Sequence, residues 1–156
     1  MNTKKCRKNL QQNFHYHLIK KIDKLCQELD NDYDINQGGC CFITYCIAKV
    51  LENYDIPYKI IIFDVYDEIE DYFDLEECEE PVYHYTIFIP FYDFIINLGE
   101  CDRCNFYYNT FESDSQKILN YYNYHNNQGN WNTTYDTLNN KYILGKFKQL
   151  LNGFIS

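Results

Sequence analysis

The chain is poor in basic residues and in long apolar runs, and each of these shortages excludes a class of protein. Its 156 residues include 14 Lys and Arg against 23 Asp and Glu, which gives a formal net charge of −9. Because a chain with this charge repels phosphate backbones, we expect no nucleic-acid partner. No run of about 18 or more apolar residues occurs, so we also expect no membrane-spanning helix.

A secretion signal is missing as well. The basic N-terminus, with Lys4, Lys5, Arg7 and Lys8, is not followed by the apolar segment that a signal peptide requires. We therefore expect a cytoplasmic protein, in the host cell or the virion if it is viral. Its eight cysteines are then expected to be thiols rather than disulfides. The basic stretch itself is interpreted as a solvated tail.

What the chain does contain is enough apolar material for one folded domain. Hydrophobic residues make up 46% of the sequence and aromatic residues 19%, so a disordered chain is not expected. The sequence has no internal repeat and no linker long enough to separate two domains. We predict a single domain over 1–156, with a flexible tail over 1–13, a core over 36–100 and a C-terminal helical extension over 101–156.

The spacing of apolar residues predicts an α+β fold. Apolar residues between His15 and Leu29 recur at helical intervals. The stretch from Cys40 to near Asp55 is apolar on nearly all sides, as in a buried helix. Ser113 is the predicted N-cap of a later helix. The predicted strands cover 58–65, 82–89 and 94–98, an acidic loop or short helix covers 66–80, and the last two helices cover 114–125 and the residues after 136. Helices and strands are thus segregated along the chain, which indicates α+β.

Cys40 is the candidate nucleophile. It follows Gly38 and Gly39 and begins the predicted buried helix, where unpaired N–H groups and the helix dipole favour a thiolate. The same N–H groups could hold a developing oxyanion, with Gln37 among the nearest side-chain amides. Cys41 is the rival nucleophile, on a side of the helix about 100° away. A structural interpretation also stands, because cysteine is among the most buried residue types.

His84 and Asn97 are the candidate partners of this thiol. His84 lies near the start of the second predicted strand, and a sheet packed on the buried helix could bring it beside Cys40. Asn97 ends the third strand, next to the second in a hairpin, where it could accept a hydrogen bond from the imidazole and fix its tautomer. Each residue also has an ordinary interpretation, His84 as a half-buried strand residue and Asn97 as a strand end before Gly99.

A second cysteine motif, Cys101-Asp102-Arg103-Cys104, allows a metal or redox interpretation. Together with Cys78 and a histidine it could form a zinc site, but a second Cys-x-x-Cys is missing. A redox pair of Cys101 and Cys104 is the other interpretation. We expect neither a metal nor a cofactor.

The segment from Gly38 to Pro57 resembles the papain-like/transglutaminase-like cysteine protein superfamily. In that family a Gly-x-Cys opens a helix, a small residue follows four positions later, here Thr44, and Ile-Pro or Leu-Pro ends the segment, here Ile56-Pro57. A strand, a strand opening with His and a strand ending in Asp or Asn then follow in the same order. The resemblance covers about two fifths of the chain, residues 36 to 100. It departs from transglutaminase-like members at Asn97, where Asp is usual.

The resemblance implies a cysteine-nucleophile hydrolase or acyltransferase that acts on an amide, peptide or isopeptide bond of a protein or peptide substrate. It assigns Cys40 as nucleophile, His84 as base and Asn97 as orienting residue. Attack by water would give a peptidase or amidase, and attack by an amine would give a crosslinking enzyme. The alternative is a structural or interaction module that keeps the fold without catalysis, such as a particle component of a phage.

Overall fold

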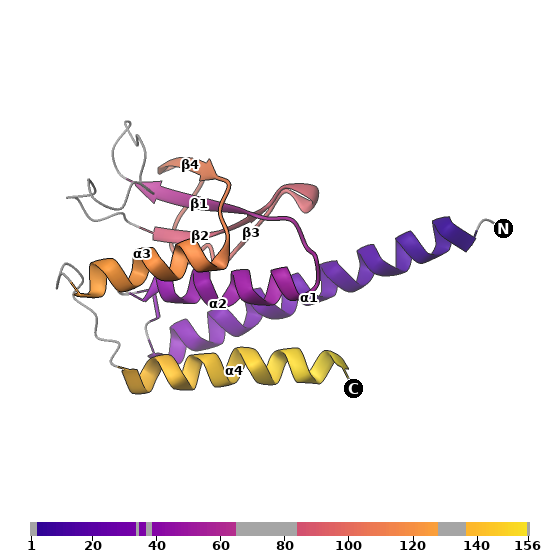
Figure 1. Ribbon diagram of the computed structural model, residues 1–156. Coiled ribbons are helices and arrows are strands. Elements are labelled where there is room, and N and C mark those ends of the chain that lie inside the picture. The colour runs from indigo at the N-terminus through magenta and orange to yellow at the C-terminus, as the bar shows by residue number, and fades with distance from the viewer. Residues whose placement is uncertain (1–2, 34, 37–38, 65–83, 128–136, 156) are drawn as a thin grey trace.

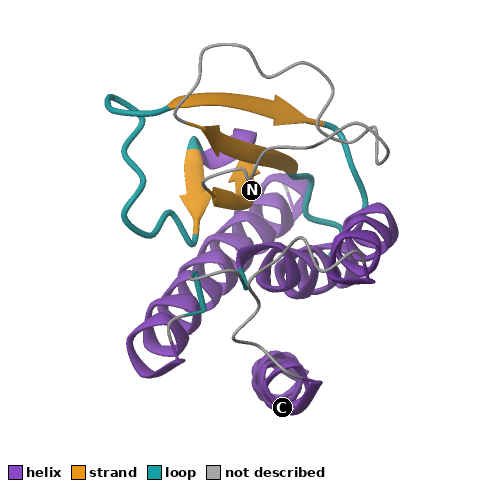
Figure 2. Ribbon diagram, turned by 90° about the vertical axis from the view of Figure 1, so that its left-hand side faces the viewer, coloured by secondary structure: helices purple, strands orange, loops and turns teal. Residues whose placement is uncertain are grey.

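The computed structural model describes residues 3–33, 35–36, 39–64, 84–127 and 137–155. They form an α+β domain in which four α-helices lie on one face of a four-stranded antiparallel sheet (Figure 1). A view from the side shows the strands as one layer above the helices (Figure 2). No helix among these residues is long and apolar enough to cross a membrane.

Helix α1 spans Thr3–Tyr33 and begins much earlier than the predicted start at His15. Its buried stripe consists of Leu18, Ile19, Ile22, Cys26 and Leu29, whereas Leu25 of the predicted stripe is only half-buried. Each of the Leu and Ile side chains contributes about 1.5–3 kcal/mol when fully buried. The residues assigned to a flexible tail are helical from Thr3 onward. Lys, Arg, Gln and Leu all favour helix, and no Gly or Pro occurs before Gly38 to interrupt it.

Helix α2, Cys40–Asn53, is the central element of the fold, as predicted for a buried helix. Ten of its 14 residues are buried, on nearly every side. It packs against the sheet and against the two later helices, and α1 contributes Ile22 and Cys26 to the same cluster. The helix ends before Pro57, where the amide of Ile56 bonds the carbonyl of Leu51.

The sheet has the strand order β3-β2-β1-β4. Strand β1 covers Lys59–Asp64, β2 covers His84–Ile89 and β3 covers Phe94–Ile96. The predicted hairpin of β2 and β3 is confirmed, and the 3₁₀ turn η1, Pro90–Tyr92, closes it. The acidic stretch 66–80 and the predicted strand residues 82 and 83 lie outside the described part of the chain.

Strand β4, Tyr107–Phe111, was not predicted from the sequence. These five residues pair with β1 and form an edge of the sheet. Four of the five side chains are exposed. The strand therefore carries no alternation of apolar and polar residues, which is the pattern that reveals a half-buried strand.

Two hydrophobic clusters lie on the two faces of the sheet. Tyr85 and Ile87 of β2 belong to the large cluster shared with the helices. Ile61 and Phe63 of β1 belong to a smaller cluster on the other face, together with Cys101 in the segment between β3 and β4. Alternation along the strands therefore decides which β2 side chains face α2.

Helices α3, Ser115–Asn127, and α4, Thr137–Ile155, complete the helical layer. The N-cap of α3 is Asp114 rather than the predicted Ser113, because Asp114 Oδ1 accepts the amide of Lys117 at 2.9 Å. Helix α4 lies farthest from the sheet in both views and buries Ile143 and Phe147 (Figures 1 and 2).

Candidate functional site

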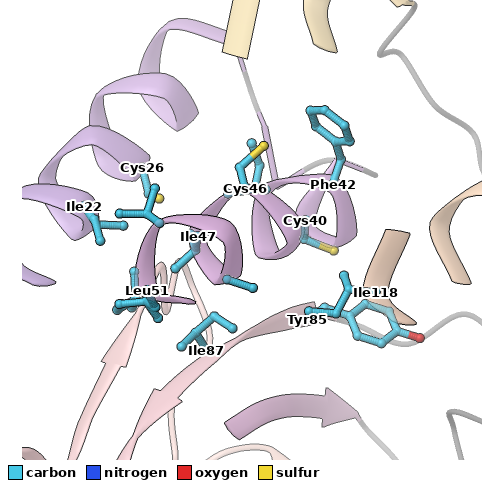
Figure 3. Close-up of a cluster of buried hydrophobic side chains, with 14 of the residues drawn as sticks. Ile22, Cys26, Cys40, Phe42, Cys46, Ile47, Leu51, Tyr85, Ile87 and Ile118 are labelled. Atoms are coloured by element: carbon cyan, nitrogen blue, oxygen red, sulfur yellow. The ribbon is translucent and has the colours of Figure 1, made fainter. Parts of the chain in front are cut away.

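Cys40 is the first residue of α2, as the sequence predicted, and its side chain is enclosed. Only 6% of the residue is exposed. The sulfur lies on the side of α2 that faces Tyr85 and Ile118 (Figure 3). Burial raises the pKa of the Cys40 thiol, and main-chain amides of Tyr85, Cys41 and Cys40 itself oppose this rise. The amides are therefore arranged to stabilise negative charge at the sulfur, although the thiol is protonated at rest.

Thr44 joins the first turn of α2 to strand β2. Its buried hydroxyl lies 2.8 Å from the carbonyl oxygen of Cys40 and 3.1 Å from that of Tyr85. A small polar residue one turn after the cysteine thus fixes the distance between the helix start and the strand that carries His84. A larger side chain would separate these two elements.

His84 begins β2 at a point where the edge strand β3 has already ended. The last pair between the two strands is Ile87 with Ile96, so His84 has no partner in β3. Instead its Nε2 lies 2.6 Å from the main-chain oxygen of Asn97. Because a carbonyl only accepts, Nε2 carries the hydrogen of this bond, and Nδ1 of the neutral ring is left as the basic nitrogen.

The environment of His84 keeps its ring neutral. The residue is 3% exposed. Burial lowers the pKa of the imidazole, and the hydrogen bond to Asn97 and the negative charge of Asp30 oppose this decrease. A buried neutral imidazole with one free nitrogen is chemically able to accept a proton.

Asn97 holds the imidazole, but with a different group from the one expected. The prediction gave this role to its side-chain amide, whereas the acceptor is the main-chain carbonyl. The side chain instead pairs with the amide of Asn36 through two hydrogen bonds of 3.0 and 3.2 Å. The backbone of Asn97 has a positive φ of 54°, which breaks the strand at this residue.

Two carboxylates of α1 support this arrangement, and sequence reasoning did not single them out. Asp23 Oδ1 accepts the amide of Asn97 at 2.8 Å, and Asp30 Oδ1 accepts the amide of Asn36 at 2.9 Å. Each carboxylate directly follows a buried residue of the α1 stripe, Ile22 or Leu29. This position at the border of the buried face of α1 is the feature of the sequence from which the two carboxylates could have been found.

Gly99 lies against the same cluster and leaves room for it. A methyl group at this position would lie 3.3 Å from Asn36 Nδ2 and 3.9 Å from His84 Nε2. Its φ of +63° also favours glycine. Five residues from three separate segments, Asp23, Asp30, Asn36, Asn97 and Gly99, thus surround one end of the His84 ring.

The Cys40 thiol lies on the helix side of the sheet, whereas the His84 side chain belongs to the opposite face. Within the described residues, no hydrogen bond links Cys40 Sγ to the His84 ring. His84 is paired with Phe63 and shares the sheet face of the smaller cluster. The expectation that the His84 face packs on the buried helix is therefore wrong, since Tyr85 and Ile87 occupy that face. The sulfur lies instead beside the main chain that links His84 to Tyr85.

The other candidates near Cys40 are placed as follows. Cys41 is buried with its Sγ 4.0 Å from the carbonyl oxygen of Ile118, and burial raises the pKa of its thiol well above the ordinary value. Gly39 is buried, and its carbonyl accepts the amide of Ile43 as the first bond of the helix. Gln37 lies outside the described residues.

The cysteines of the Cys101-x-x-Cys104 motif differ in environment. Cys101 is buried in the smaller cluster, and burial, Cys40 and Glu100 raise the pKa of its thiol to about 12. Cys104 is exposed, and Cys78 lies outside the described residues. In the part of the chain that the structure describes, no three His, Cys, Asp or Glu side chains are grouped to hold a metal ion.

Comparison with known proteins does not identify a family for this arrangement. No family model, curated protein or solved structure matches the chain. The chemistry of the site has therefore to be argued from its own geometry.

Proposed function

We propose that the chain is a papain-like/transglutaminase-like cysteine enzyme, a hydrolase or acyltransferase that acts on amide, peptide or isopeptide bonds. One observation carries the proposal. Cys40 begins a helix, and its sulfur is faced by main-chain amides, including the amide of Tyr85, whose peptide bond links Tyr85 to His84. Amides at the start of a helix are one of the groups that activate a thiol, and an imidazole within reach is the other.

The reaction follows from these groups. Nδ1 of His84 takes the proton of the Cys40 thiol as the sulfur attacks the carbonyl carbon of the substrate. A C–S bond forms, and the oxyanion is stabilised by main-chain N–H groups at the start of α2. The imidazolium then gives its proton to the leaving nitrogen as the C–N bond breaks, which leaves a thioester. Water or an amine attacks the thioester and restores the free thiol.

The two residues start this cycle as a neutral pair. Burial raises the pKa of Cys40 and lowers that of His84, so a thiolate–imidazolium pair is not the resting form. Proton transfer therefore accompanies attack on the carbonyl. The proposal also requires the His84 side chain to leave the opposite face of the sheet and approach the sulfur, because a base acts only within hydrogen-bond reach.

Alkylation of the thiol tests the proposal. We expect iodoacetamide to modify Cys40 in the native protein, and replacement His84→Gln to slow this modification at least about tenfold, because the base no longer assists. The reference protein carries Cys104→Ser, which removes an exposed thiol, and mass spectrometry of peptides reports the rate at Cys40.

His17→Gln is the matched control, because His17 is exposed on α1. The rate of Cys40 modification in the His17→Gln variant should equal that in the reference protein. A Cys40 that stays unmodified until the protein is denatured, or one that reacts equally fast in His84→Gln, would contradict the enzyme.

A second candidate function is a structural or interaction module without catalysis. The observation that favours it is the enclosure of both groups, with Cys40 6% and His84 3% exposed. In that case the polar cluster around His84 serves to join α1, the turn at Asn36 and strand β3. The same alkylation experiment separates the two, since a module predicts no native modification of Cys40.

A further inference from the structure

The charge of this acidic chain is strongly segregated. Residues 1–22 contain six Lys and Arg and no Asp or Glu, whereas the rest of the chain has eight Lys and Arg against 23 acidic residues. All the basic excess therefore belongs to the first two thirds of α1. A surface of this kind attracts a negatively charged partner.

The basic part of α1 also extends beyond the body of the protein. Figure 1 shows this end of the helix reaching past the sheet and the other helices. The side chains of residues 7–11 are exposed, and the first fully buried side chain is that of Leu18. Helical turns without tertiary contacts add little stability of their own, so this end gains most from a partner that packs on it.

A groove lies where this part of α1 meets the β2–β3 turn. Its volume is about 210 Å³, and its lining includes Lys8 and His15 of α1 and the apolar side chains of Ile56, Ile89 and Phe91. Tyr92 holds the two walls together, because its hydroxyl donates to the main-chain oxygen of Gln12 at 2.7 Å. Phe91 is 67% exposed, a large apolar side chain that a partner could cover.

We propose that this groove binds an acidic polypeptide segment of another protein, which inserts a large apolar side chain beside Phe91 and places its carboxylates near Lys8. The groove is smaller than the roughly 300–1,000 Å³ of most small-molecule pockets, so it fits one anchoring side chain. Charge complementarity selects the acidic partner. This inference does not depend on the chemistry of Cys40.

A polypeptide fits these observations better than a nucleic acid. The lining named above is mainly apolar, whereas binding to a phosphate backbone requires a row of cations along its path. A long polyanion would also continue from the groove onto a body that carries the acidic excess of the chain. A short acidic segment avoids that repulsion.

Fluorescence anisotropy of the full chain with labelled probes tests the proposal. The main probe is a short fluorescein-labelled peptide rich in Asp and Glu that contains one Phe and one Leu. Two control peptides replace either the apolar pair by Ser or the acidic residues by Gln. A single-stranded oligonucleotide and phosphatidylserine vesicles represent the other polyanions.

We expect the main peptide to bind, and the control peptides and the variants Phe91→Ser and Lys8→Glu to weaken binding about tenfold, which corresponds to about 1.4 kcal/mol each. The matched variants Tyr107→Ser and Lys117→Glu alter an exposed aromatic and an exposed cation elsewhere and should leave binding unchanged. Absence of peptide binding, binding that is unaffected by Phe91→Ser, or tighter binding of the oligonucleotide or the vesicles overturns the proposal.

Discussion

At the scale of single residues, the backbone of Asn97 decides how the imidazole is held. Three residues other than glycine have positive φ, namely Asp55, Asp93 and Asn97, within the part of the chain that the structure describes. All three are short polar residues, which tolerate the left-handed conformation better than other side chains. At Asn97 this conformation turns the main-chain oxygen towards His84, while the side chain is used elsewhere.

Replacing Asn97 separates the conformational part of its contribution from the hydrogen-bonding part. We expect Asn97→Ala to lower the free energy of unfolding by about 2–4 kcal/mol, because it combines backbone strain with loss of the buried amide pair. Asn97→Gly should lose less, since glycine adopts a positive φ without strain. Urea denaturation measures both. Equal losses in the two variants would show that the positive φ carries no cost.

The position of Asn97 could be predicted from the sequence, but the way it acts could not. It ends the third strand as expected, because an Asn with a Gly two positions later is a local turn signal. Its partners are Asn36 and Asp23, which are 61 and 74 positions away in the chain. Only the packing of α1 along β3 brings them together, so no local pattern reveals which group of Asn97 faces His84.

At the scale of the elements, helix α3 begins on a carboxylate of another helix. Glu52 of α2 accepts hydrogen bonds from the amide of Ser115 at 2.8 Å and from its hydroxyl at 2.6 Å, and a third from the Tyr58 hydroxyl at 2.7 Å. Burial alone would raise the pKa of Glu52, but these bonds together with Lys49 hold it below its ordinary value. The charged form of Glu52 thus joins α2, the residue before β1 and α3.

We expect Glu52→Ala to lower the free energy of unfolding at neutral pH by about 1–2 kcal/mol, as for loss of a helix cap. The matched control is Glu28→Ala, which removes an exposed ion pair with Lys24 and should change stability by no more than about 0.5 kcal/mol. Because the folded pKa of Glu52 is lowered, its contribution is present above the ordinary pKa and is lost as the pH falls through the folded value. If the difference in unfolding free energy between Glu52→Ala and the parent protein stayed unchanged in acid, this role would be contradicted.

The elements themselves were predictable where burial marks them. Helix α2 and the β2–β3 hairpin follow from dense apolar runs and the turn at Pro90. The start of α1 and strand β4 could not be found in this way, since residues 7–11 and four of the five residues of β4 are exposed. Exposed elements leave no periodic pattern of apolar residues in the sequence. Helix or strand propensity and pairing with a neighbouring strand determine where such elements form.

At the scale of the whole molecule, the burial of His84 makes stability depend on pH. Burial lowers the pKa of His84 in the folded chain from 6.5. As the pH falls below that value, the unfolded chain binds a proton that the folded chain does not, so stability decreases until the lowered pKa is reached. We expect chemical denaturation between neutral and mildly acidic pH to show this loss.

The His84→Gln variant isolates this effect. Its stability should fall less steeply with pH than that of the parent protein, because the titrating group is gone, even if both are less stable in acid for other reasons. The comparison uses the slope of the unfolding free energy against pH rather than its absolute value, so the test stays valid when the variant is itself destabilised. An identical slope in the two proteins would place the proton uptake at another group.

The α+β class could be predicted for the whole molecule, but the sheet face that packs on α2 could not. Alternation in β2 correctly separates His84 from Tyr85, yet either set is apolar enough to be buried: Thr86 and Phe88 follow His84, while Ile87 and Ile89 follow Tyr85. The segment between β3 and β4 packs over the face that carries His84, and this packing leaves the Tyr85 face to α2. That long-range contact has no local signature.

The enclosure of α2 on nearly every side has a consequence for how this protein can change over generations. A helix with ten buried positions out of 14 offers few sites where a new side chain is accommodated without disturbing a neighbour. Adaptation of the surroundings of Cys40 would therefore proceed through compensating changes in the strands and helices that enclose it, and α2 itself would be the slowest part of the chain to diverge.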